Sequence, residues 1–288
     1  MIFVVAAFRA SADDAGAITY TKDVAPIQPM TVLDALIAHH ILVRAGETVS
    51  FQHQQFQEWF ASFEVEKLVL EAAVGDRNSA QRLRINVLNE LVWEEAVLFA
   101  GERLARSGVH AVQAIAETII ELLSIDPMLA AKLIVKVPVA WPLIRERVVA
   151  FAMKWHTPDR VDRAVRFMIM TGASEFADII WSLITNADDQ VHLAVLGTAP
   201  RFRISVLGLN ARQRLTALPN PIRRHVLDEL AHSSDVDGVE IAAELAIADP
   251  DPDLKLGVIE ALAFRGNDRL ALQVLHQSPA PVWAQLSK

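Results

Sequence analysis

The chain has 288 residues, of which 52% are apolar, and its mean hydropathy is +0.28. This length and composition exclude a disordered chain and require a large buried core, in one large or two modest domains. The absence of cysteine excludes disulfides, thiolate metal sites and cysteine catalysis, and it fits a reducing compartment. The formal net charge of −8 argues against a generic nucleic-acid binder, which needs a basic surface to neutralise phosphates.

The opening segment MIFVVAAF is apolar, but it carries no basic flank and is too short for a signal sequence with its cleavage site. Arg9, Asp13 and Asp14 follow at once. No other run approaches the ~20 apolar residues that a membrane-spanning helix needs. We therefore expect a cytoplasmic protein with no membrane partner.

The N-terminal part has its own pattern, which ends before Ser79. Thr31 is the expected cap of a helix, because apolar residues follow it at helical spacing. Two short apolar runs, residues 41–43 and 49–51, flank a polar turn that contains Gly46, and this arrangement predicts a β-hairpin. A helix, a hairpin and a further helix in this order are typical of the later part of a winged-helix domain.

The helix predicted after the hairpin carries a stripe of aromatic side chains. Four aromatic residues occupy positions i, i+3, i+4 and i+7, which lie on one helix face. They are Phe56, Trp59, Phe60 and Phe63. Apolar neighbours at helical spacing indicate that Trp59 and also Trp181 belong to the core. If the stripe is core, Phe56→Ala should cost roughly 3–5 kcal/mol of stability.

The segment VSFQHQQFQEWFAS, residues 49–62, resembles the winged-helix region that follows the NACHT-type nucleotide-binding core of STAND NTPases. In that family a tryptophan-containing helix, similar to the one at Trp93, then leads into helical repeats. The resemblance covers about residues 31–106 and departs from the family pattern at Ser62. The matching residues are Phe51, His53, Phe56, Gln57, Glu58, Phe60 and Ala61.

The resemblance implies that the histidine matched by His53 can reach the phosphate of a nucleotide bound in the core. The chain itself has no G-x-x-x-x-G-K-[ST] motif, so it lacks the amides and the lysine of a phosphate cradle. We therefore expect no NTPase activity, and a cofactor role for His53 only if a core is supplied elsewhere; otherwise His53 caps the following helix. Met1 falls inside the expected winged-helix region, which favours a C-terminal piece of a longer switch protein.

Beyond this region a short polar residue precedes an apolar helical stretch five times, at intervals of 31, 31, 32 and 31 residues. These residues are Asp126, Thr157, Asp188, Asn220 and Asp251. Such residues accept a hydrogen bond from a free N–H of the first helical turn, and the proline that follows four of them suits the first helical position. Seven and eleven residues beyond each cap the chain is always apolar, which predicts one buried face per repeat.

Each repeat has room for two short helices, and in the last repeat we expect the first helix to break at Gly266. One such hairpin cannot bury its own apolar face, so neighbouring hairpins must stack. The stretch DPDLKLGVIEALAFRGNDRLALQVL resembles the short HEAT-like repeats common in bacterial proteins. We predict a mainly α fold: a partial winged-helix-like segment with a short β-hairpin at residues 1–75, and a right-handed α-solenoid of HEAT-like hairpins at residues 76–288.

Charge is distributed unevenly within the repeats. Residues 201–224 hold six arginines and no acid, whereas residues 228–253 hold nine acids and no lysine or arginine. The two sets can attract one another across stacked helices, or they can mark the footprint of a charged partner. The candidate partner-binding residues are Arg201, Arg203, Arg212, Arg214, Arg223 and Arg224, with Trp141 and Trp155 as the more exposed aromatic anchors.

Other chemistry has no support in the sequence. None of the nine histidines forms an H-E-x-x-H pair, and the chain has no G-x-S-x-G elbow and no glycine-rich dinucleotide turn. We expect no metal, no cofactor and no catalytic residue.

The expected function is a non-enzymatic protein-binding or ligand-sensing module, the repeat arm of a STAND-type regulator of defence or signalling. Its partner would be a protein or an upstream nucleotide-binding domain. One alternative is a HEAT-like DNA-binding protein or alkylpurine DNA glycosylase, in which arginines contact phosphates and a tryptophan stacks on a base. Another alternative is a stand-alone scaffold.

Overall fold

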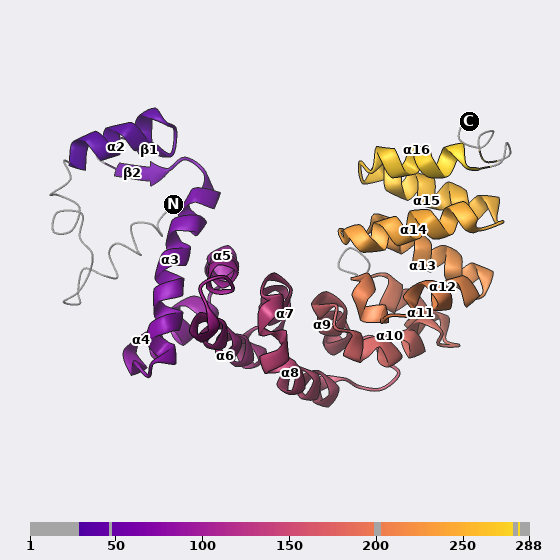
Figure 1. The fold of residues 1–288 in the computed structure, drawn as a ribbon, viewed down its shortest axis with the longest axis horizontal. Helices are drawn as coiled ribbons and strands as arrows, with labels where there is room; N and C mark the ends of the chain where they lie inside the picture. Colours follow the sequence, from indigo (N-terminus) through magenta and orange to yellow (C-terminus); the bar gives the residue numbers. More distant parts are fainter. Residues whose placement is uncertain (1–28, 46–47, 199–202, 279–281, 283–288) are drawn as a thin grey trace. The chain divides into compact units, whose positions relative to one another are not determined.

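The computed structural model describes residues 29–45, 48–198, 203–278 and 282, and it is mainly helical (Figure 1). The chain divides into two compact units, Met1–Ala114 and Ile115–Lys288. Their boundary lies within helix α6 (Val109–Ile125), whereas the sequence placed a boundary at residue 75. The difference arises because the long helix that ends near residue 75 packs on the helices that follow it.

The first unit begins with helix α2 (Pro29–Ala38) and an antiparallel hairpin of strands β1 (Leu42–Ala45) and β2 (Thr48–Phe51). Leu42 pairs with Phe51, which confirms the predicted hairpin. Thr31 is not the cap of α2, because the helix already begins at Pro29, a residue that suits the first helical turn.

Helix α3 (Gln54–Ala73) is the long helix of this unit and packs on α4 (Arg77–Arg82) and α5 (Glu94–Leu104). A π-helix at Leu83–Leu88 and a 3₁₀ turn at Leu91–Trp93 connect those two helices. The buried side chains of α3 lie from its middle onward and are Ser62, Val65, Leu68 and Val69.

The predicted aromatic stripe lies on a different face of α3, and it is exposed. The prediction that it belongs to the core is wrong, and so is the large cost expected for Phe56→Ala, since Phe56 is 37% exposed. The helical spacing of the four rings is as predicted, but the other helices of the unit pack on the neighbouring face.

The second unit is a succession of helices. In chain order they are α7 (Pro127–Lys136), α8 (Trp141–Trp155), α9 (Arg163–Thr171), α10 (Ala177–Ile184), α11 (Asp189–Leu196), α12 (Ala211–Ala217), α13 (Asn220–His232), α14 (Val236–Ala248), α15 (Pro252–Phe264) and α16 (Asp268–His276). Short 3₁₀ turns at Pro138–Ala140, Ser174–Phe176 and Ile204–Leu207 join some of them.

Three of the five predicted helix caps are confirmed. The carboxylate of Asp126 accepts hydrogen bonds from the amides of Met128 and Leu129 at the start of α7. Asp188 and Asp251 each accept one from the amide two residues on, at the starts of α11 and α15. These side chains satisfy amides that the helix itself leaves without a partner.

The other two predicted caps are wrong. Thr157 lies in a loop, and α9 begins only at Arg163, because Asp162 accepts hydrogen bonds from the amides of Val165 and of Thr157 itself. Asn220 is the first residue of α13, and its side-chain amide donates to Asp251, one period further along the chain.

The predicted buried face is confirmed at every position that the structure describes. The residues seven and eleven places beyond each predicted cap have no exposed surface, and only Ala199 lies outside the described residues. They are Leu133, Ala164, Val195, Leu227 and Val258 at the first position, and Val137, Met168, Ala231 and Leu262 at the second. The core of the second unit is therefore built from the same two positions of successive segments.

Helices in this unit pack mainly on helices one or two places away along the chain. The arrangement is clearest from α13 to α16, where α13 packs on α15 and α14 packs on α16 (Figure 1). The turn between α15 and α16 contains Gly266 at φ +73°, a left-handed conformation that glycine adopts readily, and it confirms the break predicted there.

Candidate interaction surfaces

The candidate arginines occupy α12, α13 and the segment before α12, and most of their charge is paired within the chain. Arg201 lies outside the described residues. Arg203 lies 3.9 Å from the Asp235 carboxylate, and the backbone amide of Ile204 donates to the same aspartate. Arg203 is therefore held against the start of α14.

Arg223 and Arg224 join α13 to the acidic residues around the start of α15. The Nε atom of Arg223 is 2.7 Å from Asp249, and one of its Nη atoms donates to the carbonyl of Leu218. Arg224 lies 3.3 Å from Asp251 and 2.9 Å from Asp253. These contacts support the view that the basic and acidic sets attract one another across stacked helices.

Arg212 and Arg214 lie on α12, and Arg212 is the most exposed of the described members of the set. Arg212 pairs with Glu244 at 2.9 Å, and about half of each side chain is exposed. The guanidinium of Arg214 lies 4.3 Å from the centre of the Trp181 ring and 3.9 Å from Asp178. Their role in partner binding stays a prediction.

The tryptophans fall in three different environments. Trp181 is buried as predicted, and its indole N–H donates to the carbonyl of Leu207. Trp141 is half-buried, and half-buried Trp155 packs against Phe151 and Phe167, so neither is a freely exposed anchor. Trp59 was predicted to lie in the core, but 41% of its surface is exposed.

The exposed rings of α3 form a surface that the sequence reasoning did not identify as a candidate site. We call Phe56, Trp59, Phe60 and Phe63 the aromatic face; their exposed fractions are 37%, 41%, 49% and 47%. Phe51 of β2 stacks on Phe60 at 5.3 Å, and Phe99 of α5 meets Trp59 edge-on at 5.6 Å. The face thus runs along α3 between the hairpin and α5. The four-residue spacing was a visible signal, but it does not reveal what covers a face.

Arg103 of α5 lies beneath this face. Its guanidinium is 4.1 Å from the centre of the Phe63 ring and 5.0 Å from that of Trp59. It also pairs with Glu66 at 2.7 Å and donates to the Ser62 hydroxyl at 2.8 Å. These contacts fix the two rings from one side, although the Nη2 atom of Arg103 is buried without a hydrogen-bond partner.

His53 occupies the cap position at the start of α3, as expected for a histidine at a strand end. Its side chain makes no capping hydrogen bond and lies exposed near Phe56, with ring centres 6.0 Å apart.

Helix α13 also carries titratable groups at i, i+3, i+4 and i+7. They are His225, Asp228, Glu229 and His232. Burial raises the pKa of both Asp228 and Glu229, and the charge of Asp228 raises the pKa of Glu229 further. The charges of His225 and His232 lower both pKa values, but by less than burial raises them. Among the described residues no group of three or more such side chains is arranged to hold a metal ion.

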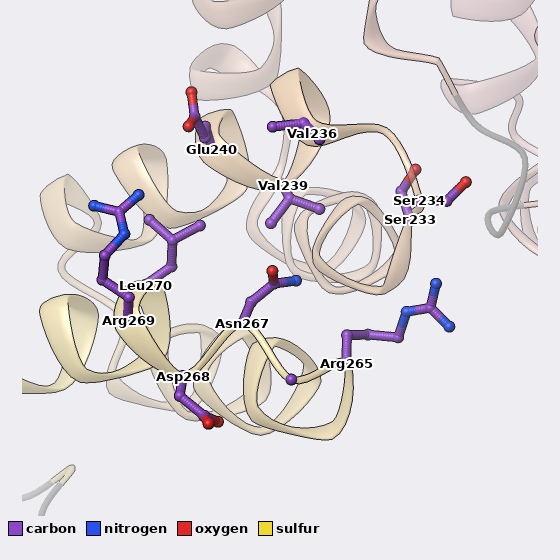
Figure 2. Close-up of a pocket in the computed structure, with 11 residues that line it drawn as sticks. Ser233, Ser234, Val236, Val239, Glu240, Arg265, Asn267, Asp268, Arg269 and Leu270 are labelled. Carbon is purple, nitrogen blue, oxygen red and sulfur yellow. The ribbon is translucent and has the colours of Figure 1, made fainter.

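A pocket of about 530 Å³ lies where the turn between α15 and α16 meets α14 (Figure 2). In Figure 2 Arg265 and Arg269 lie on opposite sides of Asn267. Glu240 and Asp268 also line the pocket, so its charge is mixed. This lining favours neither an anion nor a cation.

No family model matches the chain, and no curated protein or solved structure matches it. Within the described residues no single helix is long and apolar enough to cross a membrane. One pair of consecutive helical segments, Pro127–Lys136 and Pro138–Trp155, together has the length and composition of a membrane span, but the two are bent by 100° relative to each other.

We expect Arg223→Ala to lower the free energy of unfolding by about 3 kcal/mol, because it leaves the largely buried Asp249 carboxylate without its cation. The matched change Arg212→Ala removes an exposed pair and should cost less than about 1 kcal/mol. Urea unfolding of both variants measures the difference. Equal losses would show that the Arg223 contacts do not join the two segments.

The stability should also respond to the two half-buried carboxylates of α13. A raised pKa in the folded state means that stability is lost as the pH rises through that pKa. Glu229→Gln removes this penalty, so the variant should gain stability over the unmodified chain at pH 7 and gain little at pH 4. Thermal melts at both pH values measure the difference, with exposed Glu146→Gln as the control. A gain that does not depend on pH would contradict the assignment.

Proposed function

We propose that this chain is a non-enzymatic interaction module, built as a right-handed α-solenoid of HEAT-like hairpins. The observation that carries the proposal is the complete burial of two positions that recur about 31 residues apart, the first in five segments and the second in the four segments where the structure describes it. Helices that pack mainly on near neighbours in the chain are what a stacked repeat array requires. An array of this kind offers an extended surface for a large partner, and a protein is the partner that we propose.

The N-terminal unit supports a more specific proposal, the repeat arm of a STAND-type regulator. The order of α2, the β1–β2 hairpin and α3 fits the later part of a winged-helix domain, and residues 49–62 resemble the NACHT-associated signature. In that arrangement the arm would sense a ligand or partner, and the winged-helix segment would transmit the event to a nucleotide-binding core supplied elsewhere. His53 would then face the nucleotide.

The internal pairing of Arg223 and Arg224 supports a protein partner over nucleic acid. Acidic side chains already neutralise these cations, and the chain as a whole carries a net charge of −8. A DNA-binding surface instead needs cations that are available to phosphates.

The test is affinity capture with the purified chain as bait, followed by a binding titration with the purified partner. We expect one protein partner whose binding is weakened at least tenfold by Arg212→Glu/Arg214→Glu, while the melting temperature changes little, because both side chains are substantially exposed. A captured protein with a P-loop nucleotide-binding core would support the STAND proposal in particular.

The matched control is Arg265→Glu/Arg269→Glu, which makes the same change of charge at two exposed arginines near α16. The control should bind the partner normally. Equal weakening by both variants would show a nonspecific charge effect, and capture of nucleic acid alone, or of nothing, would contradict the proposed function.

A further inference from the structure

The aromatic face of α3 has the composition of an interaction site. Monomeric proteins seldom expose several large aromatic rings side by side, and Trp, Phe and Arg are enriched at the centres of protein interfaces. Here one tryptophan and three phenylalanines lie along two turns of one helix, with Arg103 beneath them. The rings are also held in place: Phe51 stacks on Phe60, Phe99 meets Trp59 edge-on, and Arg103 contacts Trp59 and Phe63.

The spacing of the rings makes the face symmetrical about its own centre, which falls between Trp59 and Phe60. In an antiparallel pair of α3 helices, Phe56 would therefore lie opposite Phe63 of the partner subunit, and Trp59 would lie opposite Phe60 of the partner subunit. A twofold interface requires this self-complementary pattern. We propose that the aromatic face binds the aromatic face of a second copy of this chain, with the two α3 helices antiparallel across a twofold axis.

The charges beside the face are compatible with this arrangement. In the same register Glu64 lies opposite Gln55 of the partner subunit, and Glu66 lies opposite His53 of the partner subunit. Glu58 lies opposite Ala61 of the partner subunit. No acidic residue of α3 meets another acid across the axis, whereas a parallel pair would bring each acid close to its own copy. The acids also make the face a poor surface for phosphate groups of nucleic acids or lipids.

The area of the face indicates a modest affinity. A large aromatic side chain buries about 150–250 Å², so four side chains exposed by about two-fifths supply roughly 350 Å². A standard interface buries about 800 Å² per partner. Leu70, which is also exposed and lies seven residues beyond Phe63 on α3, extends the surface but does not complete it. The dimer should therefore form with a Kd in the micromolar range, independently of whether the repeat-array proposal holds.

Sedimentation equilibrium of the full chain tests the association. We expect the mass to rise from one chain toward two between low and several hundred micromolar concentration. Trp59→Glu should remain monomeric throughout this range, because it places a charge at the centre of the interface. The control Phe264→Glu changes an aromatic residue of α15 that is 82% exposed, and it should dimerise like the unmodified chain.

The orientation can be tested directly because the chain contains no cysteine. A disulfide requires Cα atoms within about 7 Å. In the antiparallel dimer two copies of residue 56 are offset by seven residues, or about 10 Å, along the helices. An equal mixture of Phe56→Cys and Phe63→Cys should therefore cross-link, while each variant alone should cross-link several times more slowly.

Three results would overturn the proposal. The unmodified chain could remain monomeric at every concentration, which would leave the face to a different protein. Cross-linking of each variant with itself, as fast as in the mixture, would indicate a parallel or nonspecific contact. Dimerisation that persists in folded Trp59→Glu, as judged by its circular dichroism, would place the interface elsewhere.

Discussion

The second unit depends on one constraint: each helical segment has an apolar face that it cannot bury by itself. The residues seven and eleven places beyond the caps are fully buried wherever the structure describes them, and in a stacked repeat array the neighbouring segment would supply that cover. Burial of a side chain such as Leu227 or Val258 contributes about 1.5–3 kcal/mol, so the same two positions repeated along the chain supply much of the stability of the unit. The spacing of about 31 residues follows from this need, because each segment must present its face in register with its neighbour.

Polar contacts also align α13 with α15. Asn220, Arg223 and Arg224 on α13 all bind acids next to the start of α15, so the cap of one helix is also the docking point for the preceding segment. Asp251 illustrates the double role, because one oxygen of its carboxylate accepts from its own helix and the other accepts from Asn220 and Arg224. The charged residues of the repeats are thus largely used inside the molecule, which leaves the aromatic face of α3 as the more conspicuous surface for a partner.

The regular features were predictable from sequence because they depend on local chemistry. The caps at Asp126, Asp188 and Asp251, the buried face and the break at Gly266 all follow from short-range spacing. The prediction of a cap at Thr157 was wrong because Asp162, five residues further on, accepts the hydrogen bond from the first helical turn, so the helix begins later. The prediction that Trp59 lies in the core was wrong for a different reason. Helical spacing shows which residues share a helix face, but it does not show whether another element covers that face. The hydrogen bond between Asn220 and Asp251 could have been anticipated from the sequence, because the two residues are one 31-residue period apart.

Hydrogen exchange read by mass spectrometry, on Leu227→Ala compared with the unmodified chain, tests the repeat architecture most directly. Leu227 is fully buried in α13, and its truncation should remove about 2–5 kcal/mol from the local packing. In a stacked array the loss is confined to neighbouring segments, so exchange should accelerate in α13 to α16 and change little in α7 to α9. Equal acceleration in all of these helices would show a single cooperative core and would contradict the repeat array.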